Sequence, residues 1–147
     1  MEQQIVISRN LPAELTAAID RVQPDRLFVL TDVNTRDFCL PVLRDALSAS
    51  KYQSFNVITI GASDEAKTLD TLAEVWTALG EGGATRHSML INLGGGMVTD
   101  LGGFAASTFK RGIAYVNIPT TLLAMVDASV GGKTGINFRG LKNEIGV

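Results

Sequence analysis

Apolar residues along the chain follow two alternating patterns, short continuous runs and faces with helical spacing. The continuous runs are typical of strands that are buried on both faces. These predicted strands cover residues 5–7, 26–30, 55–60, 88–93 and 113–118. The helically spaced faces predict helices at 15–22, 38–47, 64–80, 98–109 and 122–130. Strands alternating with helices of this length predict an α/β fold of the Rossmann-like, doubly wound type, with a mostly parallel sheet and helices on both faces.

Two of these helices carry more specific expectations. In the helix at 38–47, the expected apolar face comprises Phe38, Val42, Leu43 and Leu47, and Pro41 is tolerated only near the first turn. In the next helix, Asp64 and Glu65 are expected in the first turn, where acidic side chains favour the helix dipole. Gly80 is its candidate C-cap.

The glycine-rich stretch from 94 to 100 connects the fourth predicted strand to the apolar helix that follows. Three consecutive glycines at such a turn let backbone N–H groups approach a phosphate, where the helix dipole favours negative charge. A tight connection without a ligand is the alternative, although adjacent glycines lose much backbone entropy on folding. Neither standard motif fits. Thr99 breaks the dinucleotide pattern G-x-G-x-x-G, and Asp127 stands at the first glycine of a P-loop pattern ending in Gly132-Lys133-Thr134.

Polar residues follow several predicted strands, at the ends that a parallel sheet brings to one edge. Ligands of doubly wound sheets bind outside these carboxyl ends. The residues concerned are Asp32, Asp64, the stretch 94–100 and Pro119-Thr120-Thr121. Asp32 is well placed for a ribose hydroxyl, and Asp32, Asn34 or Thr35 suits the N-cap of the next helix equally well. One residue can serve both roles, so both interpretations stay open.

The last part of the chain suggests an anion-binding site. Asp127 lies in the apolar run 122–130, where a carboxylate must be paired or functional because burying it alone is costly. Pairing with Lys133 is the purely structural alternative. Lys133, Lys142 and Asn143 lie among glycines and form a cationic edge suited to carboxylates or phosphates. A solvated charged loop is the alternative there.

Length and composition narrow the classes of function. The chain has 147 residues, 46% hydrophobic and 19% charged, which is typical of one well-packed globular domain. Its formal charge of −2 and the lack of a basic stripe argue against nucleic acid as a partner. No apolar run approaches about 20 residues and the first residues lack a signal-peptide pattern, so no membrane partner and a cytoplasmic location are expected. One cysteine and one histidine cannot form a zinc site, so no metal ligands are expected in this chain.

Two long runs resemble the 3-dehydroquinate synthase family. The first, 94–112, reads GGGMVTDLGGFAASTFKRG, and the second, 117–137, reads NIPTTLLAMVDASVGGKTGIN. The close match extends from 91 to 146, and the first ninety residues agree in layout only. The resemblance implies an N-terminal NAD-binding α/β domain and a C-terminal, mostly helical metal-binding domain.

The resemblance also implies a reaction. Enzymes of this family convert a seven-carbon phosphorylated sugar acid, 3-deoxy-D-arabino-heptulosonate 7-phosphate (DAHP), to 3-dehydroquinate and phosphate. This is the second step of the shikimate pathway, which leads to the aromatic amino acids. Bound NAD oxidises one carbinol transiently and is regenerated in each turnover, and zinc or cobalt polarises the reacting oxygens.

Matching the family's motifs residue by residue implies a cofactor site at the carboxyl edge. Asp32 and Asn34 correspond to residues that hold the adenosine ribose side of NAD. The family's Gly-Glu-x-x-Lys segment is matched in part by 63–67, with Asp64 for the glutamate and Lys67 for the lysine. The remaining implied cofactor contacts are Gly95, Gly96, Met97, Asp100, Thr120, Thr121 and Leu123.

The same matching implies residues for the sugar-phosphate substrate and for a second subunit. The residues expected between cofactor and substrate are Asp127, Lys133, Lys142 and Asn143. Arg111 corresponds to an arginine that reaches into the partner subunit's site, which implies a homodimer. Thr99 stands where the family usually has glycine, and Ala128 where it often has serine.

The sequence stops in the middle of a family motif, so residues 1–147 are expected to be a truncated N-terminal domain that is inactive alone. The zinc or cobalt ligands are then expected outside this chain. Related sugar-phosphate cyclases that make 2-deoxy-scyllo-inosose or valiolone are one alternative, and related metal-dependent dehydrogenases are another. The lysine-rich edge favours a cyclase, because an alcohol substrate needs no anion clamp. A non-catalytic nucleotide-binding module is the alternative from another class.

Overall fold

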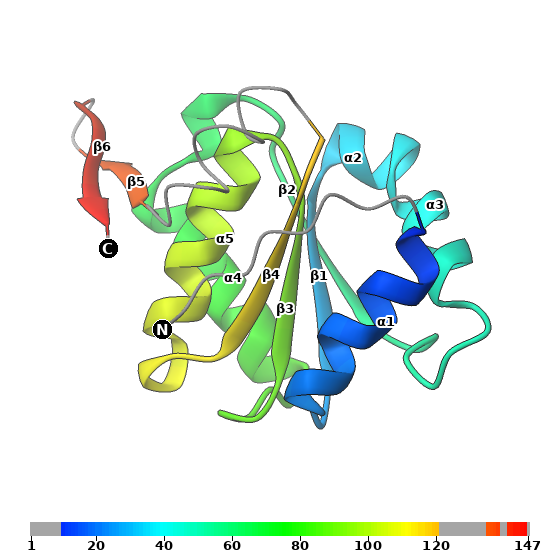
Figure 1. Cartoon of the computed structure of the whole chain (residues 1–147). Helices are drawn as coiled ribbons and strands as arrows, with labels where there is room; N and C mark the ends of the chain where they lie inside the picture. Colours follow the sequence, from blue (N-terminus) through cyan, green and yellow to red (C-terminus); the bar gives the residue numbers. More distant parts are fainter. Residues whose placement is uncertain (1–9, 121–134, 139–140, 147) are drawn as a thin grey trace.

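The computed structural model describes residues 10–120, 135–138 and 141–146. At its centre lies a parallel sheet of four strands in the order β2-β1-β3-β4 (Figure 1). These strands are β1 (Leu27–Asp32), β2 (Asn56–Ile60), β3 (Met89–Gly94) and β4 (Ala114–Pro119). A separate antiparallel pair comprises β5 (Gly135–Phe138) and β6 (Leu141–Gly146). The predicted strand at 5–7 and the predicted helix at 122–130 lie outside the described residues.

Helices cover both faces of the sheet, which confirms the doubly wound architecture (Figure 1). The helices α1 (Leu11–Val22) and α3 (Leu40–Leu47) pack on one face, and α4 (Leu69–Glu81) and α5 (Gly96–Thr108) pack on the other. Shorter segments are α2 (Val33–Phe38), η1 (Asp64–Ala66) and η2 (Phe109–Arg111). Alternate residues of β1 serve the two faces, so Leu30 packs with α4 and α5 while Val29 packs with α1 and α3.

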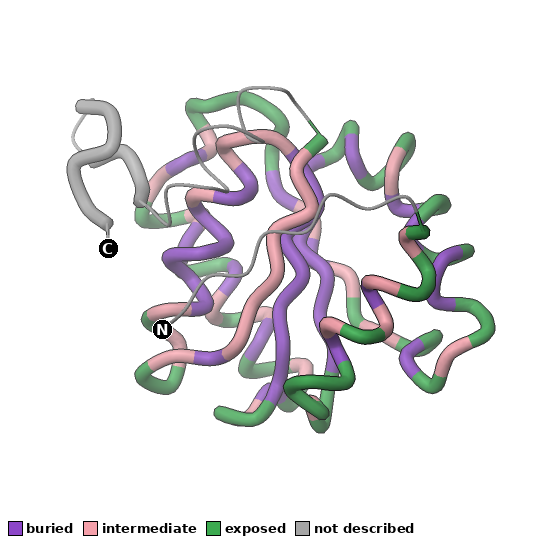
Figure 2. The backbone as a smooth tube through the Cα atoms, viewed as in Figure 1, coloured by how far each residue is buried: buried purple, intermediate pink, exposed green. Residues whose placement is uncertain are grey.

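The two central strands are buried along their whole length (Figure 2). Because helices cover both of their faces, neither face needs polar residues, and the sequence therefore shows continuous apolar runs rather than alternation. The flanking strands β2 and β4 are more accessible, and most of their residues are only partly buried. Continuous runs therefore predicted β1 and β3 well.

The chain after β1 forms two helices, α2 and α3, where a single helix was expected. Pro41 lies in the first turn of α3, as predicted, and it has no N–H with which to continue the hydrogen bonds of α2. The expected apolar face is correct for Leu43 and Leu47, which are buried. It is wrong for Phe38 and Val42, which are 78% and 60% exposed.

The helix α4 begins and ends later than predicted. Asp64 and Glu65 form the separate turn η1, and the side chain of Thr68 caps α4 instead. A threonine hydroxyl accepts a hydrogen bond from a free N–H of the first turn, which starts the helix there. Gly80 lies inside the helix, and the C-cap is Gly82.

The strand order creates a switch point between β1 and β3. From β1 the chain turns through α2 and α3 on one face toward β2, whereas from β3 it turns through α5 on the other face toward β4. Thr31 pairs with Leu93, so Asp32 and Gly94 stand level at the carboxyl ends of the two strands. In doubly wound sheets ligands bind at this place, where the connections diverge.

Candidate functional site

The glycine turn, residues 94–96, joins the buried end of β3 to the first turn of α5. A Cβ on Gly94 would lie 2.6 Å from the Val98 side chain, so glycine allows the strand and the helix to meet this closely. Gly95 is the N-cap of α5, and no side chain within the described residues caps this helix. A Cβ on Gly96 would meet no atom of the described residues within 4 Å, so this part of the chain leaves the space beside Gly96 open. The N–H groups at this end of a 13-residue helix therefore suit an anion.

Thr99 supports the turn from inside the helix. Its buried hydroxyl donates hydrogen bonds to the carbonyl oxygens of Gly95 and Gly96, at 3.2 and 3.3 Å. Its backbone N–H also donates to the Gly95 carbonyl, at 3.0 Å. The residue that breaks the standard dinucleotide pattern thus has a role that a glycine could not fill, because glycine has no hydroxyl.

A buried ion pair joins the segment after β2 to α5. The Lys67 Nζ lies 2.7 Å from the Asp100 Oδ2, and the two side chains are 4% and 22% exposed. Charges taken out of water interact strongly only when they are closely paired, as these are. The structure thereby brings together two residues expected at the cofactor site from different segments of the chain. The Asp100 carboxylate remains partly accessible, one turn into the helix that begins at the glycine turn.

Asp32 caps α2 at the carboxyl end of β1. Its Oδ1 accepts hydrogen bonds from the N–H groups of Asn34 and Thr35, both at 2.8 Å, and the Thr35 hydroxyl accepts one from the Asp32 N–H. This capping box confirms one of the two roles expected for Asp32. Both capping hydrogen bonds use the same oxygen, so Oδ2 can accept hydrogen bonds without uncapping the helix. The Asn34 side chain next to it is exposed.

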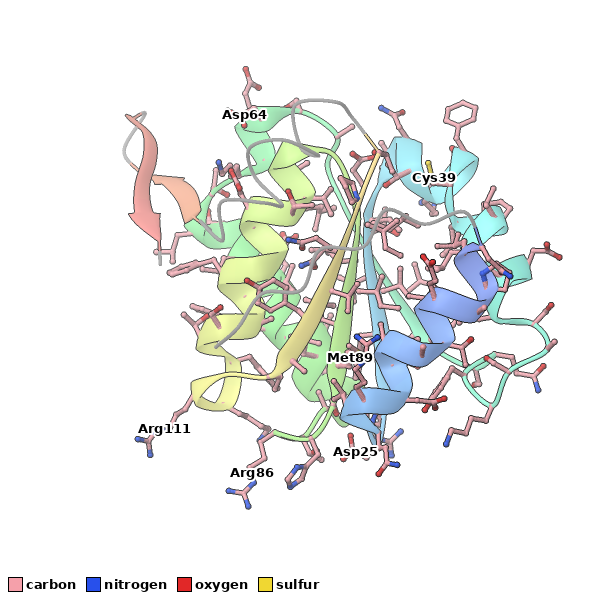
Figure 3. The ribbon with its side chains drawn as sticks, in the orientation of Figure 1. Asp25, Cys39, Asp64, Arg86, Met89 and Arg111 are labelled. Atoms are coloured by element: carbon pink, nitrogen blue, oxygen red, sulfur yellow. The ribbon has the colours of Figure 1, made fainter. Side chains whose placement is uncertain are left out.

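Three further expected residues lie near the same edge. The Thr120 N–H donates to the Gly94 carbonyl at 2.9 Å, so the residue after β4 is tied to the glycine turn. Asp64 is exposed in η1, after β2, at the upper end of the molecule in Figure 3. Met97, in the first turn of α5, is half-buried and packs against the core on the α4 and α5 face. All three follow or flank the carboxyl ends of strands.

Several expected residues have no described side chain. Thr121, Leu123, Asp127 and Lys133 lie outside the described residues, and Lys142 and Asn143 lie on β6. The strand that pairs with β6, β5, lies beside α5 (Figure 1). The roles expected for these six residues therefore stay predictions.

Arg111 lies at the opposite end of the sheet. It is exposed in η2, before the start of β4, and Figure 3 shows it far from Asp64. Lys110 and Arg111 have φ values of 47° and 69°, in the left-handed region that residues with a Cβ rarely adopt. Among the described residues, the structure therefore does not bring Arg111 together with Asp32, the glycine turn or Asp100 of its own chain.

The same amino-terminal end of the sheet holds a cavity of about 370 Å³. Its lining comprises Val22, Gln23, Asp25, Arg86, His87, Ser88 and Ala114. Ser88 donates a hydrogen bond to Asp25 at 2.7 Å, and the Thr85 hydroxyl donates another. These hydrogen bonds lower the pKa of Asp25, and they join the start of β1 to the loop before β3. The His87 side chain is exposed.

The sequence patterns did not single out Asn92, a buried polar residue close to the glycine turn. Asn92 is fully buried on β3, where its Nδ2 donates to the Asn117 Oδ1 at 3.0 Å. Its only signal in the sequence is an amide within an otherwise apolar strand, which requires a partner. The pairing of Lys67 with Asp100 had no local signal either, because it depends on which strands are neighbours.

Comparison with known proteins decides the family. The family model for the N-terminal part of 3-dehydroquinate synthase matches residues 57–147. The chain belongs to the 3-dehydroquinate synthase family. A 3-dehydroquinate synthase of Parabacteroides distasonis is 52% identical over 145 residues, which cover 99% of this chain and 40% of that protein. The chain spans about two fifths of the length of the curated relatives it matches.

Solved structures of related cyclases share the fold. A 2-epi-5-epi-valiolone synthase from Streptomyces hygroscopicus subsp. jinggangensis 5008, with NAD⁺ and Zn²⁺ bound, matches all of this chain and 40% of its own, at a TM-score of 0.87 and 36% identity. A 2-deoxy-scyllo-inosose synthase complexed with carbaglucose-6-phosphate, NAD⁺ and Co²⁺ matches 93% of this chain and 38% of its own, at a TM-score of 0.84 and 26% identity. These matches confirm the Rossmann-like fold.

Two features are absent from the described residues. Within them, no group of three or more histidine, cysteine, aspartate or glutamate side chains is placed to hold a metal ion. No helix in the same part of the chain is long and apolar enough to span a bilayer.

Proposed function

We propose that this chain is the NAD-binding part of a 3-dehydroquinate synthase, which converts DAHP to 3-dehydroquinate and phosphate. Membership of the family supports the activity, and the curated relatives that match over most of this chain are named 3-dehydroquinate synthases rather than other cyclases. The observation that carries the proposal is the Lys67–Asp100 ion pair beside the uncapped, glycine-lined start of α5. It combines an anion-binding helix end with an accessible carboxylate.

The described residues fit a dinucleotide. A pyrophosphate suits the N–H groups at the start of α5, because Gly96 leaves the space beside them open. A ribose suits the Asp32 Oδ2, which stands at the end of the neighbouring strand and accepts hydrogen bonds from hydroxyl groups. Asp100 suits the other ribose, and Lys67 offsets the repulsion between its carboxylate and the phosphates.

In the proposed enzyme the residues of this chain bind and orient the reactants. NAD supplies reversible hydride transfer, and zinc or cobalt, held by residues outside this chain, polarises the reacting oxygens. Lys133 and Lys142 neutralise the carboxylate and phosphate of the sugar-phosphate substrate, as the family's motifs imply. Asp127 and Asn143 lie between cofactor and substrate in the same scheme.

We also propose a homodimer in which Arg111 reaches the partner subunit's site. Its exposure at the opposite end of the sheet supports this arrangement, since its side chain lies away from the glycine turn of its own chain. The consecutive left-handed residues Lys110 and Arg111 support it as well, because strained backbone concentrates at functional sites.

Calorimetric titration with NAD⁺ tests the cofactor site. We expect saturable binding to the folded chain, and Asp100→Ala weakens it about tenfold or more by removing a charged hydrogen-bond acceptor. Asp70→Ala is the matched control, because it removes an exposed carboxylate from the first turn of α4, and its affinity stays that of the unaltered chain. A folded chain that does not bind NAD⁺, or equal affinity of the two variants, contradicts the proposed site.

A second measurement tests the activity itself. We expect the complete protein to release phosphate from DAHP while its total NAD content stays constant, because the cofactor is regenerated in each turnover. Absence of turnover with bound NAD⁺ would favour one of the related cyclases, whose substrates can be assayed in the same way.

A further inference from the structure

The helix that carries the glycine turn packs on the sheet mainly through small and apolar residues. Val98, Leu101, Ala105 and Ala106 are completely buried in this contact. The sizes of these side chains set how closely the helix approaches the sheet. Because apolar contacts are non-directional, they define the exact position of the helix less sharply than a polar group held in a fixed orientation, and α5 meets such a group in Asn92.

The Asn92 side chain lies against Gly102, one of the glycines of α5. A Cβ on Gly102 would lie 2.0 Å from the Asn92 Oδ1 and 2.4 Å from its Cγ, so any larger residue collides with the amide. Asn117 holds that amide from the neighbouring strand, through the 3.0 Å hydrogen bond to its Nδ2. The completely buried Oδ1 has no hydrogen-bond partner among the described residues. Such an atom destabilises a fold, and its presence calls for an explanation.

The position of this contact in the chain links it to the site. Asn92 lies two residues before Gly94, and Gly102 lies six residues after Gly96, about 9 Å along the helix axis. The contact therefore closes a short segment that contains the whole glycine turn and Asp100. A shift of α5 at Gly102 moves the N–H groups of the turn and the Asp100 carboxylate together.

We propose that Asn92 is a positioning residue of the cofactor site, acting through its contact with Gly102. The amide, held by Asn117, sets the depth of α5 over β3 and thereby the place of the turn's N–H groups and of the Asp100 carboxylate. The inference rests on the proposed NAD site for its functional consequence. Its geometric part, the ordering of residues 95–100, stands without a ligand.

Complementary substitutions test the contact. Gly102→Ala adds a methyl group that collides with the Asn92 amide and meets the end of the Leu30 side chain at 2.8 Å, so it lifts the helix. We expect NAD⁺ binding to weaken about tenfold or more, because the N–H groups of the turn move away from the phosphates. Asn92→Ala removes the amide and loosens the same contact, and it remains measurable if Gly102→Ala does not fold. In the double variant the new methyl group no longer meets the amide, and only the flexible end of the Leu30 side chain, 2.8 Å from its Cβ, has to shift. We expect its affinity to return to within about threefold of the unaltered chain.

Leu79→Ala is the control for a purely structural role. Leu79 is completely buried on α4 in the same core, and its truncation lowers the free energy of unfolding without touching the glycine turn. Two quantities are measured for all variants: the Kd for NAD⁺ by calorimetry, and hydrogen exchange at residues 95–100 without ligand. We expect weaker binding and faster exchange in Asn92→Ala and Gly102→Ala, and neither change in Leu79→Ala.

Other results of the titration and of the exchange measurement would overturn one part of the proposal or the other. If Leu79→Ala loses affinity as the two contact variants do, or if those variants bind NAD⁺ normally, the positioning role is overturned. If the unaltered chain binds no NAD⁺, the proposed function fails, and the exchange data then decide the contact alone. Faster exchange confined to the Asn92 and Gly102 variants supports the ordering of the turn, and equal exchange in all variants overturns it.

Discussion

Asp32 illustrates how one side chain at the carboxyl edge can serve both the fold and the site. Its Oδ1 accepts both capping hydrogen bonds of α2, and Oδ2 lies outside the cap. The capping role was one of two interpretations that the sequence left open, and it could be named because aspartate before a helix is a local pattern with a local cause. The ribose role depends on β1 and β3 being neighbours, which no local pattern encodes.

The carboxylate of Asp25 gives a test of electrostatics at the residue scale. Hydrogen bonds from Thr85 and Ser88 lower its pKa in the folded chain below the usual value. A lowered folded-state pKa stabilises the fold above the unfolded-state pKa of about 3.9, and this stabilisation is lost as the pH falls through the folded-state pKa. We therefore expect Asp25→Asn to lower the free energy of unfolding at about pH 7, with the difference shrinking toward about pH 3.

Urea unfolding at a series of pH values checks this expectation. Asp45→Asn on α3 is the control, since the exposed Asp45 side chain makes no hydrogen bond to the described residues. Its effect should be small at neutral pH. A pH-independent difference between Asp25→Asn and the unaltered chain would mean that the hydrogen bonds from Thr85 and Ser88 do not distinguish the ionised carboxylate from the neutral one.

At the scale of elements, prediction succeeded where the cause was local or repeated. Continuous apolar runs predicted the two central strands, and three adjacent glycines predicted the turn after β3. The predicted apolar face of the helix at 38–47 was wrong in part. Periodicity shows which residues share one face of a helix, but it does not show whether another part of the protein packs against that face. Phe38 and Val42 keep the helical spacing and yet are exposed. The ion pair of Lys67 with Asp100 could not be predicted from a local pattern, because predicting it requires the spatial order of the strands.

A substitution in the glycine turn should change the affinity for NAD⁺ without changing the thermal stability of the fold. A Cβ at Gly96 meets no atom in the part of the chain that the structure describes, so Gly96→Ala should fold normally, because alanine is at least as good a helix residue. The added methyl group nevertheless fills the space through which a phosphate approaches the N–H groups. We expect an NAD⁺ affinity at least about tenfold lower, with no loss of thermal stability.

Gly80→Ala provides the matched control for this substitution. Gly80 also lies in a helix with open space beside it, on α4 and away from the turn. Its replacement should raise the free energy of unfolding by about 0.5–1 kcal/mol and leave the NAD⁺ affinity unchanged. Thermal unfolding and calorimetry on the two variants make the comparison. Unchanged affinity in Gly96→Ala would show that no ligand approaches the turn from that side.

At the scale of the whole molecule, the two ends of the sheet have separate expected roles. Asp32, the glycine turn and Asp100 lie at the carboxyl end, whereas Arg111 lies before the start of β4 at the other end. The resemblance to the family implies that all of them serve one kind of active site. The length of a strand separates Arg111 from the glycine turn of the same chain. A homodimer, in which Arg111 of one subunit reaches the site of the other, would satisfy both the family's motifs and this structure.

This arrangement predicts complementation between two inactive variants of the complete enzyme. Arg111→Ala should lower the turnover of DAHP while leaving NAD⁺ affinity unchanged, because Arg111 is remote from the turn of its own chain. Asp100→Ala should lower both. In a mixed dimer, the site of the Arg111→Ala subunit keeps its own Asp100 and receives Arg111 from its partner, so it is intact, whereas the other site lacks both residues.

Random exchange of subunits in an equal mixture makes half of the dimers mixed, each with one intact site. The mixture should therefore recover about a quarter of the unaltered activity, while each variant alone stays inactive. Phosphate release measured before and after subunit exchange checks this, and mixing two separately purified batches of Arg111→Ala is the control. If activity stays at the level of the separate variants, Arg111 does not act across a subunit boundary. Its exposed, strained position would then require a role at the surface of a single chain.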